Sequence, residues 1–104
     1  MDATHENAAH AISNTILIVD DEDINREILA NLFEEEFQTE EAENGVVALQ
    51  KVLTRPQEYC AILLDVVMDE MDGLQMLEHL RKADIIAHVP VFLITAETSS
   101  AVTE

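Results

Sequence analysis

The sequence AILLDVVMDEMDG, residues 61–73, decides the fold. Four consecutive apolar residues precede Asp65, a pattern typical of a strand that is buried on both faces, as in a parallel sheet. Asp65 would then lie at the carboxyl end of this strand, where open α/β sheets bind their ligands. An acidic loop follows and leads through Gly73 into a helical segment. The stretch therefore predicts a central strand that presents a carboxylate at the ligand-binding edge of a sheet.

Two other apolar segments end in the same way. Residues 16–19 (ILIV) run into the acid pair Asp20 and Asp21, and residues 91–94 (VFLI) run into Thr95. The carboxyl ends of parallel strands meet at one edge of a sheet. Three carboxylates and one hydroxyl are therefore expected to converge there.

The segments between these strands have the helical spacing of apolar residues. We expect a helix over residues 24–36, a turn at Asn44-Gly45 followed by a second helix from residue 46 to about Arg55-Pro56, and a third helix after residue 73, with a weak edge strand within 37–42. This alternation of strands and helices predicts an α/β fold with a parallel sheet and right-handed crossovers.

The first helix should bury one face and expose the other. Acids at its start suit the positive end of the helix dipole, and capping of the helix accounts for Asp23 but not for the earlier pair, Asp20 and Asp21. Asn25 and Arg26 fall on the face expected to be exposed. The apolar face comprises Ile24, Ile28, Leu29, Leu32 and Phe33.

Length and composition indicate one domain. The chain has 104 residues, of which 48% are hydrophobic and 26% charged, as in ordinary globular proteins. Residues 1–13 show no clear strand or helix face, so we expect a flexible N-terminal tail followed by a domain at 14–104. The single cysteine, Cys60, excludes an internal disulfide and fits a reducing compartment, and no apolar run is long enough to span a membrane. A cytoplasmic protein is expected.

The acidic character narrows the choice of partners. A formal net charge of -17 argues against binding to nucleic acid or to an anionic membrane, and it favours cations. Two carboxylates about 5 Å apart repel by about 3 kcal/mol at an effective dielectric constant of 20. A cluster of acids at the strand ends therefore requires a cation, and ligands that are all oxygen suit Mg²⁺ or Mn²⁺ rather than zinc. A carboxylate beside such an ion can accept a phosphoryl group as a nucleophile.

Four segments of the chain carry a resemblance to a known family: ILIVDDEDINREIL (16–29), AENGVVAL (42–49), AILLDVVMDEMDG (61–73) and VPVFLITA (89–96). Together they resemble the receiver domain of two-component response regulators. The resemblance implies a flavodoxin-like (CheY-like) doubly wound parallel sheet. The family has the strand order 2-1-3-4-5, so this chain is expected to show 2-1-3-4 and to lack the fifth strand and the fifth helix.

The resemblance implies a role for each acid. Asp65 would be the phospho-acceptor and a ligand of the metal ion. Asp21 would ligate the ion directly, Asp20 would hold one of its water molecules, and Val67 would supply a backbone carbonyl. Many members of the family carry a polar side chain where this chain has Val67, and such a group could orient attacking water.

The resemblance also implies roles for Thr95 and Ala96, and the chain differs from the family at two other positions. Thr95 would be the switch hydroxyl that turns toward the phosphoryl group, and Ala96 would leave room for that group. Asp69 stands where the family usually has proline. The family also places a lysine on its fifth strand, which this chain is expected to lack, and Lys51 and Lys82 lie in or at the end of helices and cannot replace it.

Two readings of function follow, of which the first is preferred. The domain would accept a phosphoryl group from a sensor histidine kinase or phosphotransfer protein and would not be a turnover enzyme. The alternative is a degenerate or truncated receiver that acts as an interaction or dimerisation module without phosphorylation. A metal-dependent phosphatase would require a second acid where Val67 stands. In either reading, residues 91–94 are expected to form an exposed strand edge that pairs with a second copy or another protein.

Overall fold

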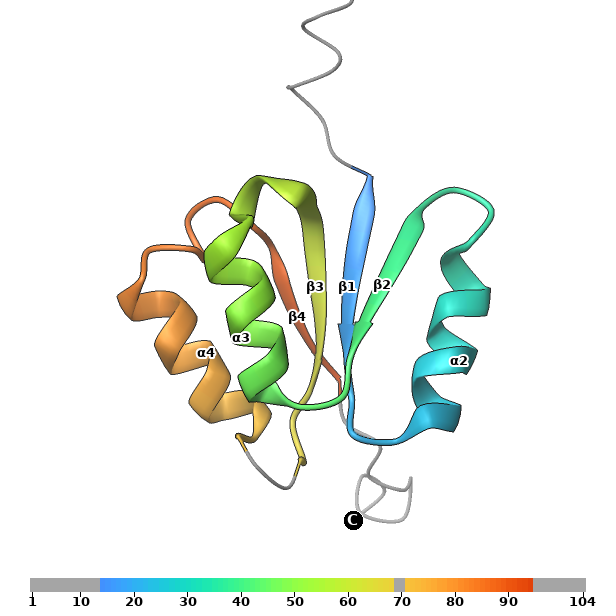
Figure 1. Cartoon of the computed structure of the whole chain (residues 1–104), viewed down its shortest axis with the longest axis horizontal. Coiled ribbons are helices and arrows are strands. Elements are labelled where there is room, and N and C mark those ends of the chain that lie inside the picture. Colours follow the sequence, from blue (N-terminus) through green and yellow to red (C-terminus); the bar gives the residue numbers. More distant parts are fainter. Residues whose placement is uncertain (1–13, 69–70, 95–104) are drawn as a thin grey trace, which may run out of the picture.

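The computed structural model describes residues 14–68 and 71–94. These residues form a sheet of four parallel strands in the order β2-β1-β3-β4, with helices on both faces (Figure 1). The predicted fold class and strand order are confirmed. Among the described residues, no helix is long and apolar enough to cross a membrane. In chain order the elements are β1 (Thr15–Val19), α2 (Asp23–Phe33), β2 (Gln38–Ala42), α3 (Gly45–Thr54), the 3₁₀ turn η1 (Pro56–Glu58), β3 (Tyr59–Asp65), α4 (Gly73–Lys82) and β4 (Val91–Ile94).

The two faces of the sheet are covered unequally. Helices α3 and α4 lie together on one face, and α2 lies alone on the other (Figure 1). Alternate residues of a strand point to opposite faces. Leu17 therefore joins the large core under α3 and α4, in which Met76 and Leu80 are fully buried. Under α2, the core is smaller, and its buried residues among those the structure describes are Ile16, Ile18 and Leu63.

Helix α2 differs from the prediction in its length. It ends at Phe33 and not near residue 36, because residues 34–36 are all glutamate at the negative end of the helix dipole, where acids are unfavourable. Of its apolar residues, Leu29 and Phe33 pack against the sheet. The apolar stripe is too wide for one sheet face to cover, and the side chains at its outer edge are more than half exposed: Ile24 (63%), Ile28 (54%) and Leu32 (68%).

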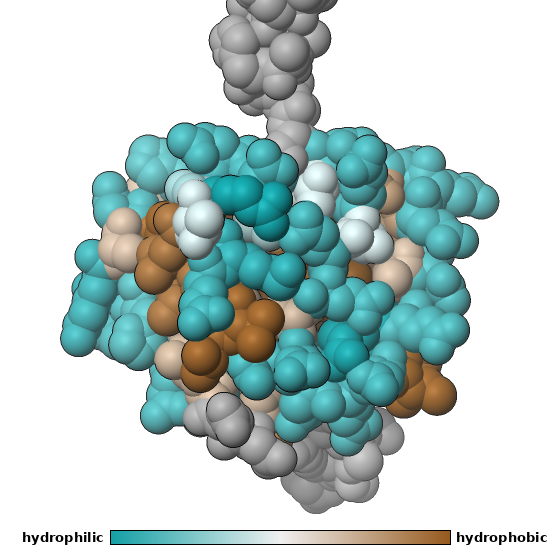
Figure 2. Space-filling view, in the orientation of Figure 1, coloured by the Kyte–Doolittle hydropathy of each residue, from teal (hydrophilic) through white to brown (hydrophobic). Residues whose placement is uncertain are grey.

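The outer surface over α3 and α4 also carries apolar side chains. Figure 2 shows a mostly hydrophilic face on which hydrophobic surface gathers beside these two helices. Leu53 of α3 is 49% exposed and Leu74 of α4 is 56% exposed. Such single apolar residues are common on protein surfaces and require no special role.

Helices α3 and α4 both begin with a glycine that another backbone segment approaches closely. A β-carbon on Gly45 would lie 2.5 Å from the carbonyl oxygen of Met71, and one on Gly73 would lie 2.4 Å from that of Asp65. The amide of Gly73 also donates a hydrogen bond to the carbonyl of Val66 (3.0 Å). The start of α4 is therefore fixed directly against the carboxyl end of β3.

Candidate functional site

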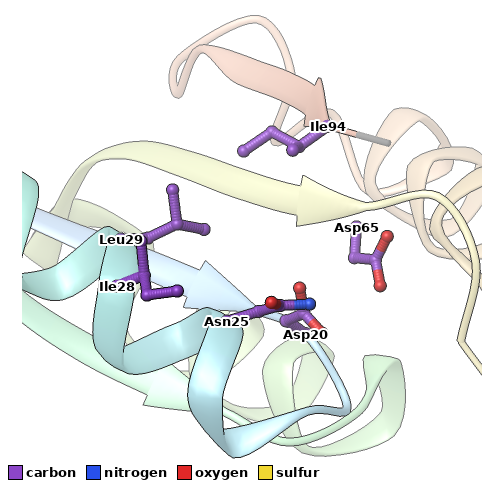
Figure 3. Close-up of a pocket in the computed structure, with 6 residues that line it drawn as sticks. All are labelled: Asp20, Asn25, Ile28, Leu29, Asp65 and Ile94. Atoms are coloured by element: carbon purple, nitrogen blue, oxygen red, sulfur yellow. The ribbon is translucent and has the colours of Figure 1, made fainter. Parts of the chain in front are cut away.

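The strand ends bring three carboxylates together. Asp20 follows β1, Asp21 is the next residue, and Asp65 is the last residue of β3; one carboxylate oxygen of each lies within 4.8 Å of the others. The parallel pairing of β1 with β3 sets Val19 opposite Leu64, so the acids that come next in each strand are neighbours. In Figure 3 the side chains of Asp20 and Asp65 point toward the same space. The structure thus brings these three acids together as the sequence predicted.

The environment of Asp65 disfavours its negative charge. Asp65 is only 6% exposed and Asp20 only 4% exposed, whereas Asp21 is open to solvent. Burial raises the pKa of Asp65, a hydrogen bond donated by the Val67 amide to Asp65 Oδ1 (3.2 Å) opposes that shift, and the neighbouring carboxylates of Asp20 and Asp21 add to it. The net effect is upward. The site therefore favours the binding of a cation or a proton.

The donor set fits a hard divalent cation. Three carboxylates converge, and the ion pairs formed within residues 14–68 and 71–94 involve other acids. Mg²⁺ prefers oxygen ligands, takes one or two carboxylates, and keeps several water molecules. The exposed position of Asp21 leaves room for such waters. The three acids could therefore hold Mg²⁺ or Mn²⁺.

A small hollow adjoins the acids. Its volume is about 170 Å³, and α2 provides three of the six residues that line it (Figure 3). Asn25 is one of them, although the sequence placed it on the exposed face of the helix. The hollow is lined by Asp20, Asn25, Ile28, Leu29, Asp65 and Ile94.

Arg26 is also on the polar face of the helix, opposite the apolar residues, but it is largely covered. Its side chain is only 11% exposed, because it lies across the end of β2 and the loop after β1. Its Nη1 donates to the backbone carbonyl of Asp20 (2.7 Å), its Nε donates to Glu41 Oε1 (2.9 Å), and its Nη2 pairs with Asp23. Burial lowers the pKa of Arg26, but the bonds to Glu41 and Asp23 raise it by more. A helical pattern alone does not reveal these contacts, since they depend on the position of β2.

Helix capping does not account for Asp23. The N-cap residue of α2 is Glu22, which makes no side-chain cap bond, and the carboxylate of Asp23 binds Arg26 instead. The side chain of Asp20 takes part in the turn, because its Oδ1 accepts a hydrogen bond from the Glu22 amide (2.9 Å). Both acids thus help to shape the loop between β1 and α2.

The other predicted site residues have different outcomes. Val67 lies beside Asp65 with its side chain 62% exposed, and the metal contact of its carbonyl stays a prediction. Thr95, Ala96 and Asp69 lie outside the described residues, so their roles also stay predictions. Lys51 is on α3, where its Nζ lies 3.9 Å from Glu40 Oε1.

Comparison with known proteins identifies the family. The model of the response regulator receiver domain matches residues 16–104. The transcriptional regulatory protein SrrA of Staphylococcus aureus (strain NCTC 8325 / PS 47) is 41% identical over 87 residues, which cover 83% of this chain and 34% of SrrA. The chain thus spans about a third of the length of the curated relatives it matches.

Solved structures agree with this similarity. Chemotaxis protein CheY4 of Vibrio cholerae superimposes with a TM-score of 0.72 at 26% identity, over 88% of this chain and 76% of CheY4. Response regulator TrrA of Thermotoga maritima, solved in complex with Mg(2+)-BeF, gives a TM-score of 0.72 at 35% identity, over 82% of this chain and 71% of TrrA. From its fold, its family match and its close relatives, the chain belongs to the response regulator receiver domain family.

Proposed function

We propose that this receiver domain accepts a phosphoryl group on Asp65 from a sensor histidine kinase or phosphotransfer protein in a phosphorelay. The observation that carries the proposal is the buried Asp65 carboxylate, which lies within 4.8 Å of Asp20 and Asp21 at the end of β3 and whose pKa is raised. Receiver domains are regulatory. This one would act as a phospho-acceptor in the cytoplasm and not as a turnover enzyme.

The acids would perform this reaction with a bound metal ion. Receiver domains typically bind Mg²⁺ at an acidic pocket, and the carboxylate cluster suits Mg²⁺ or Mn²⁺. Asp21 and Asp65 would ligate the ion, Asp20 would hold one of its waters, and Val67 would offer its backbone carbonyl. When bound, the ion would neutralise negative charge on the phosphoryl oxygens.

Asp65 would be the nucleophile. One of its carboxylate oxygens would form a bond to phosphorus as the P–N bond of the donor's phosphohistidine breaks, and the imidazole nitrogen would keep the electron pair. The Val67 amide, bonded to Asp65 Oδ1, would hold the carboxylate in one orientation. Thr95 would donate a hydrogen bond to a phosphoryl oxygen, and the small side chain of Ala96 would leave room for the group.

The exposed apolar surfaces support two protein contacts. Ile28 lines the hollow and is more than half exposed, as is Ile24 about one turn earlier on α2, and we propose that the phosphodonor protein docks there. Phe92 (55% exposed) and Leu93 (44% exposed) lie on β4, which has one strand neighbour among the described residues. We propose that this edge pairs with a second copy of the chain or with another protein. Sedimentation should then show an association that Phe92→Lys weakens.

Incubation with acetyl phosphate and Mg²⁺, followed by intact-mass and peptide mass spectrometry, tests the phosphoryl transfer. The wild type should gain one phosphoryl group on Asp65, and Asp65→Asn should gain none. Asp84→Asn is a matched control, since Asp84 is an exposed aspartate after α4. Modification that persists in Asp65→Asn would refute the assignment.

The same experiment separates the two readings of function. A degenerate receiver that acts only as an interaction module would stay unmodified under conditions that modify a known receiver. The convergence of all three acids gives no support to that reading, because an interaction module has no need of buried like charges.

A further inference from the structure

We propose that Arg26 is a positioning residue for the acidic site. By binding the backbone of Asp20, Arg26 holds the carboxylates of Asp20 and Asp21 in their convergence on Asp65. This inference rests on the proposed function, because it assigns Arg26 a part in preparing the site for its metal ion.

The contacts of Arg26 join three elements next to the site. Its Nη1 binds the Asp20 carbonyl at the end of β1 (2.7 Å), its Nη2 binds Asp23 at the start of α2, and its Nε binds Glu41 on β2 (2.9 Å). The amide of Asp20 also donates to the carbonyl of Ala42 on β2 (3.2 Å). The backbone of Asp20 is therefore held on its amide side by β2 and on its carbonyl side by Arg26.

This restraint opposes the electrostatic repulsion among the three carboxylates. The three carboxylates repel one another, and without a cation the loop after β1 could relieve that repulsion by moving Asp20 and Asp21 away from Asp65. A loop held in the binding geometry before the ion arrives loses less free energy on binding. Loss of Arg26 would also leave the Asp20 carbonyl without this donor.

The alternative explanation is that Arg26 acts only through its positive charge. Its side-chain ion pairs are with Asp23 and Glu41, and its contact with Asp20 is to the uncharged backbone carbonyl. The two explanations predict opposite changes in the affinity for Mg²⁺ when Arg26 is removed. If Arg26 acted only through its positive charge, its removal would make the site more negative and tighten Mg²⁺ binding. If Arg26 positions the loop, its removal weakens Mg²⁺ binding.

Calorimetric titration with Mg²⁺ of the wild type, Arg26→Gln and Arg26→Lys distinguishes these cases. We expect Arg26→Gln to raise the Kd about tenfold, the lower end of the 10–100-fold loss typical of residues that orient metal ligands. Arg26→Lys should raise it by a similar factor, because an ammonium group cannot reach three acceptors as the guanidinium fork does. Glu41→Gln, which removes the negative charge of one partner of the arginine but keeps an acceptor oxygen, should have a smaller effect in the same direction.

Arg55→Gln is the matched control. Arg55 also bridges two glutamates, Glu40 and Glu58, but it lies at the end of α3 and away from the acids. Its removal should lower the free energy of unfolding and leave the Kd for Mg²⁺ unchanged. An unchanged or lower Kd in both Arg26 variants would overturn the proposal, even if those variants were less stable, because that result is expected of a purely structural residue.

Amide hydrogen exchange in the metal-free protein gives a second readout. Both Arg26 variants should speed exchange of the Asp20 and Glu22 amides, while amides of the central strand, such as that of Leu64, keep their rates relative to global unfolding. Unchanged exchange at Asp20 and Glu22 would also overturn the proposal. If the wild type itself fails to bind Mg²⁺, the proposed function is wrong, and the exchange data alone decide whether Arg26 holds the loop.

Discussion

The sheet carries carboxylates at least partly shielded from solvent in two regions, and the groups around them carry opposite charges. At the carboxyl end, Asp20 and Asp65 lie next to each other and to Asp21. In the middle of β2, Glu40 accepts a hydrogen bond from the Tyr59 hydroxyl (2.7 Å). Two basic side chains complete this second group: Arg55 Nη2 lies 3.6 Å from Glu40 Oε1 and Lys51 Nζ lies 3.9 Å from it.

This difference indicates that one region stabilises the fold and the other serves function. A partly exposed acid such as Glu40, with a donor and cations around it, stabilises the native state, whereas acids that face one another destabilise it until a cation binds. Groups with such perturbed ionisation cluster at functional sites. We call the two regions the acidic site (Asp20, Asp21 and Asp65) and the Glu40 network (Glu40, Lys51, Arg55 and Tyr59). Neutralising an acid should stabilise the metal-free protein in the acidic site and destabilise it in the Glu40 network.

Mg²⁺ should have the largest effect, and it should act on the acidic site alone. At a concentration of one hundred times the Kd, an ion that binds only the native state raises the free energy of unfolding by about 2.7 kcal/mol. Chemical denaturation with and without Mg²⁺ measures this change. Asp21→Asn should remove most of it, and Tyr59→Phe should leave it intact. An equal response in Asp21→Asn and the wild type would contradict the assigned metal site.

Neutralising one acid in each region should change the free energy of unfolding of the metal-free protein in opposite directions. Asp65→Asn should raise the free energy of unfolding by roughly 1–3 kcal/mol, because it removes a buried charge repelled by two neighbours. Glu40→Gln should lower it by roughly 1 kcal/mol, because it weakens a hydrogen bond and two ion pairs. Urea denaturation in the presence of a chelator checks both. Destabilisation of similar size by both variants would show that the acidic site is not strained.

The pH dependence should follow the raised pKa of Asp65. The native state favours the protonated form of this acid, so the native state is penalised once Asp65 ionises. The penalty is absent below the ordinary aspartate pKa of about 4 and grows as the pH rises through the higher native value, by at most about 1.4 kcal/mol per pH unit. The difference in unfolding free energy between the wild type and Asp65→Asn, measured without metal, should therefore widen from acid to neutral pH. A difference that does not vary with pH would contradict the shift.

The smallest effect is expected for the hydroxyl of Tyr59. Burial and the hydrogen bond to Glu40 raise the pKa of Tyr59 to about 12. The chain has one tyrosine and no tryptophan, so absorbance of the phenolate reports Tyr59 alone. Its midpoint should lie near 12 in the native protein and near 10 after denaturation. Stability gained from the neutral hydroxyl is lost as the pH rises from 10 through 12, and Tyr59→Phe should cost about 1 kcal/mol at neutral pH.

The acidic site could be predicted from sequence because it depends on strand ends. Apolar runs that stop at Asp20 and Asp65 indicate where two strands end, and parallel pairing then brings those ends together. The weak strand at β2 was also placed correctly at an edge, since its polar composition is unsuited to a central position. Local patterns and one topological rule were sufficient for these features.

The Glu40 network and Arg26 could not be predicted in that way. Tyr59 reaches Glu40 across the sheet, and Arg26 reaches Glu41, so both contacts depend on the register and packing of β2. A helical pattern assigns Arg26 to the polar face, and it cannot show that β2 covers that side chain. Contacts between polar residues far apart in sequence leave no periodic signal.

The two glycines of the chain have a mechanical consequence. Gly45 touches the backbone of Met71 and Gly73 touches that of Asp65, at distances that leave no room for a β-carbon. A displacement of the chain at Asp65 is therefore transmitted to the first turn of α4, and a displacement at Met71 is transmitted to the first turn of α3. Substitution of Gly73 by alanine would push the start of α4 and the backbone at Asp65 apart, because the added β-carbon would lie only 2.4 Å from the Asp65 carbonyl oxygen. A change in the backbone at Asp65 therefore has a short path, through direct contact, to the N-terminus of α4.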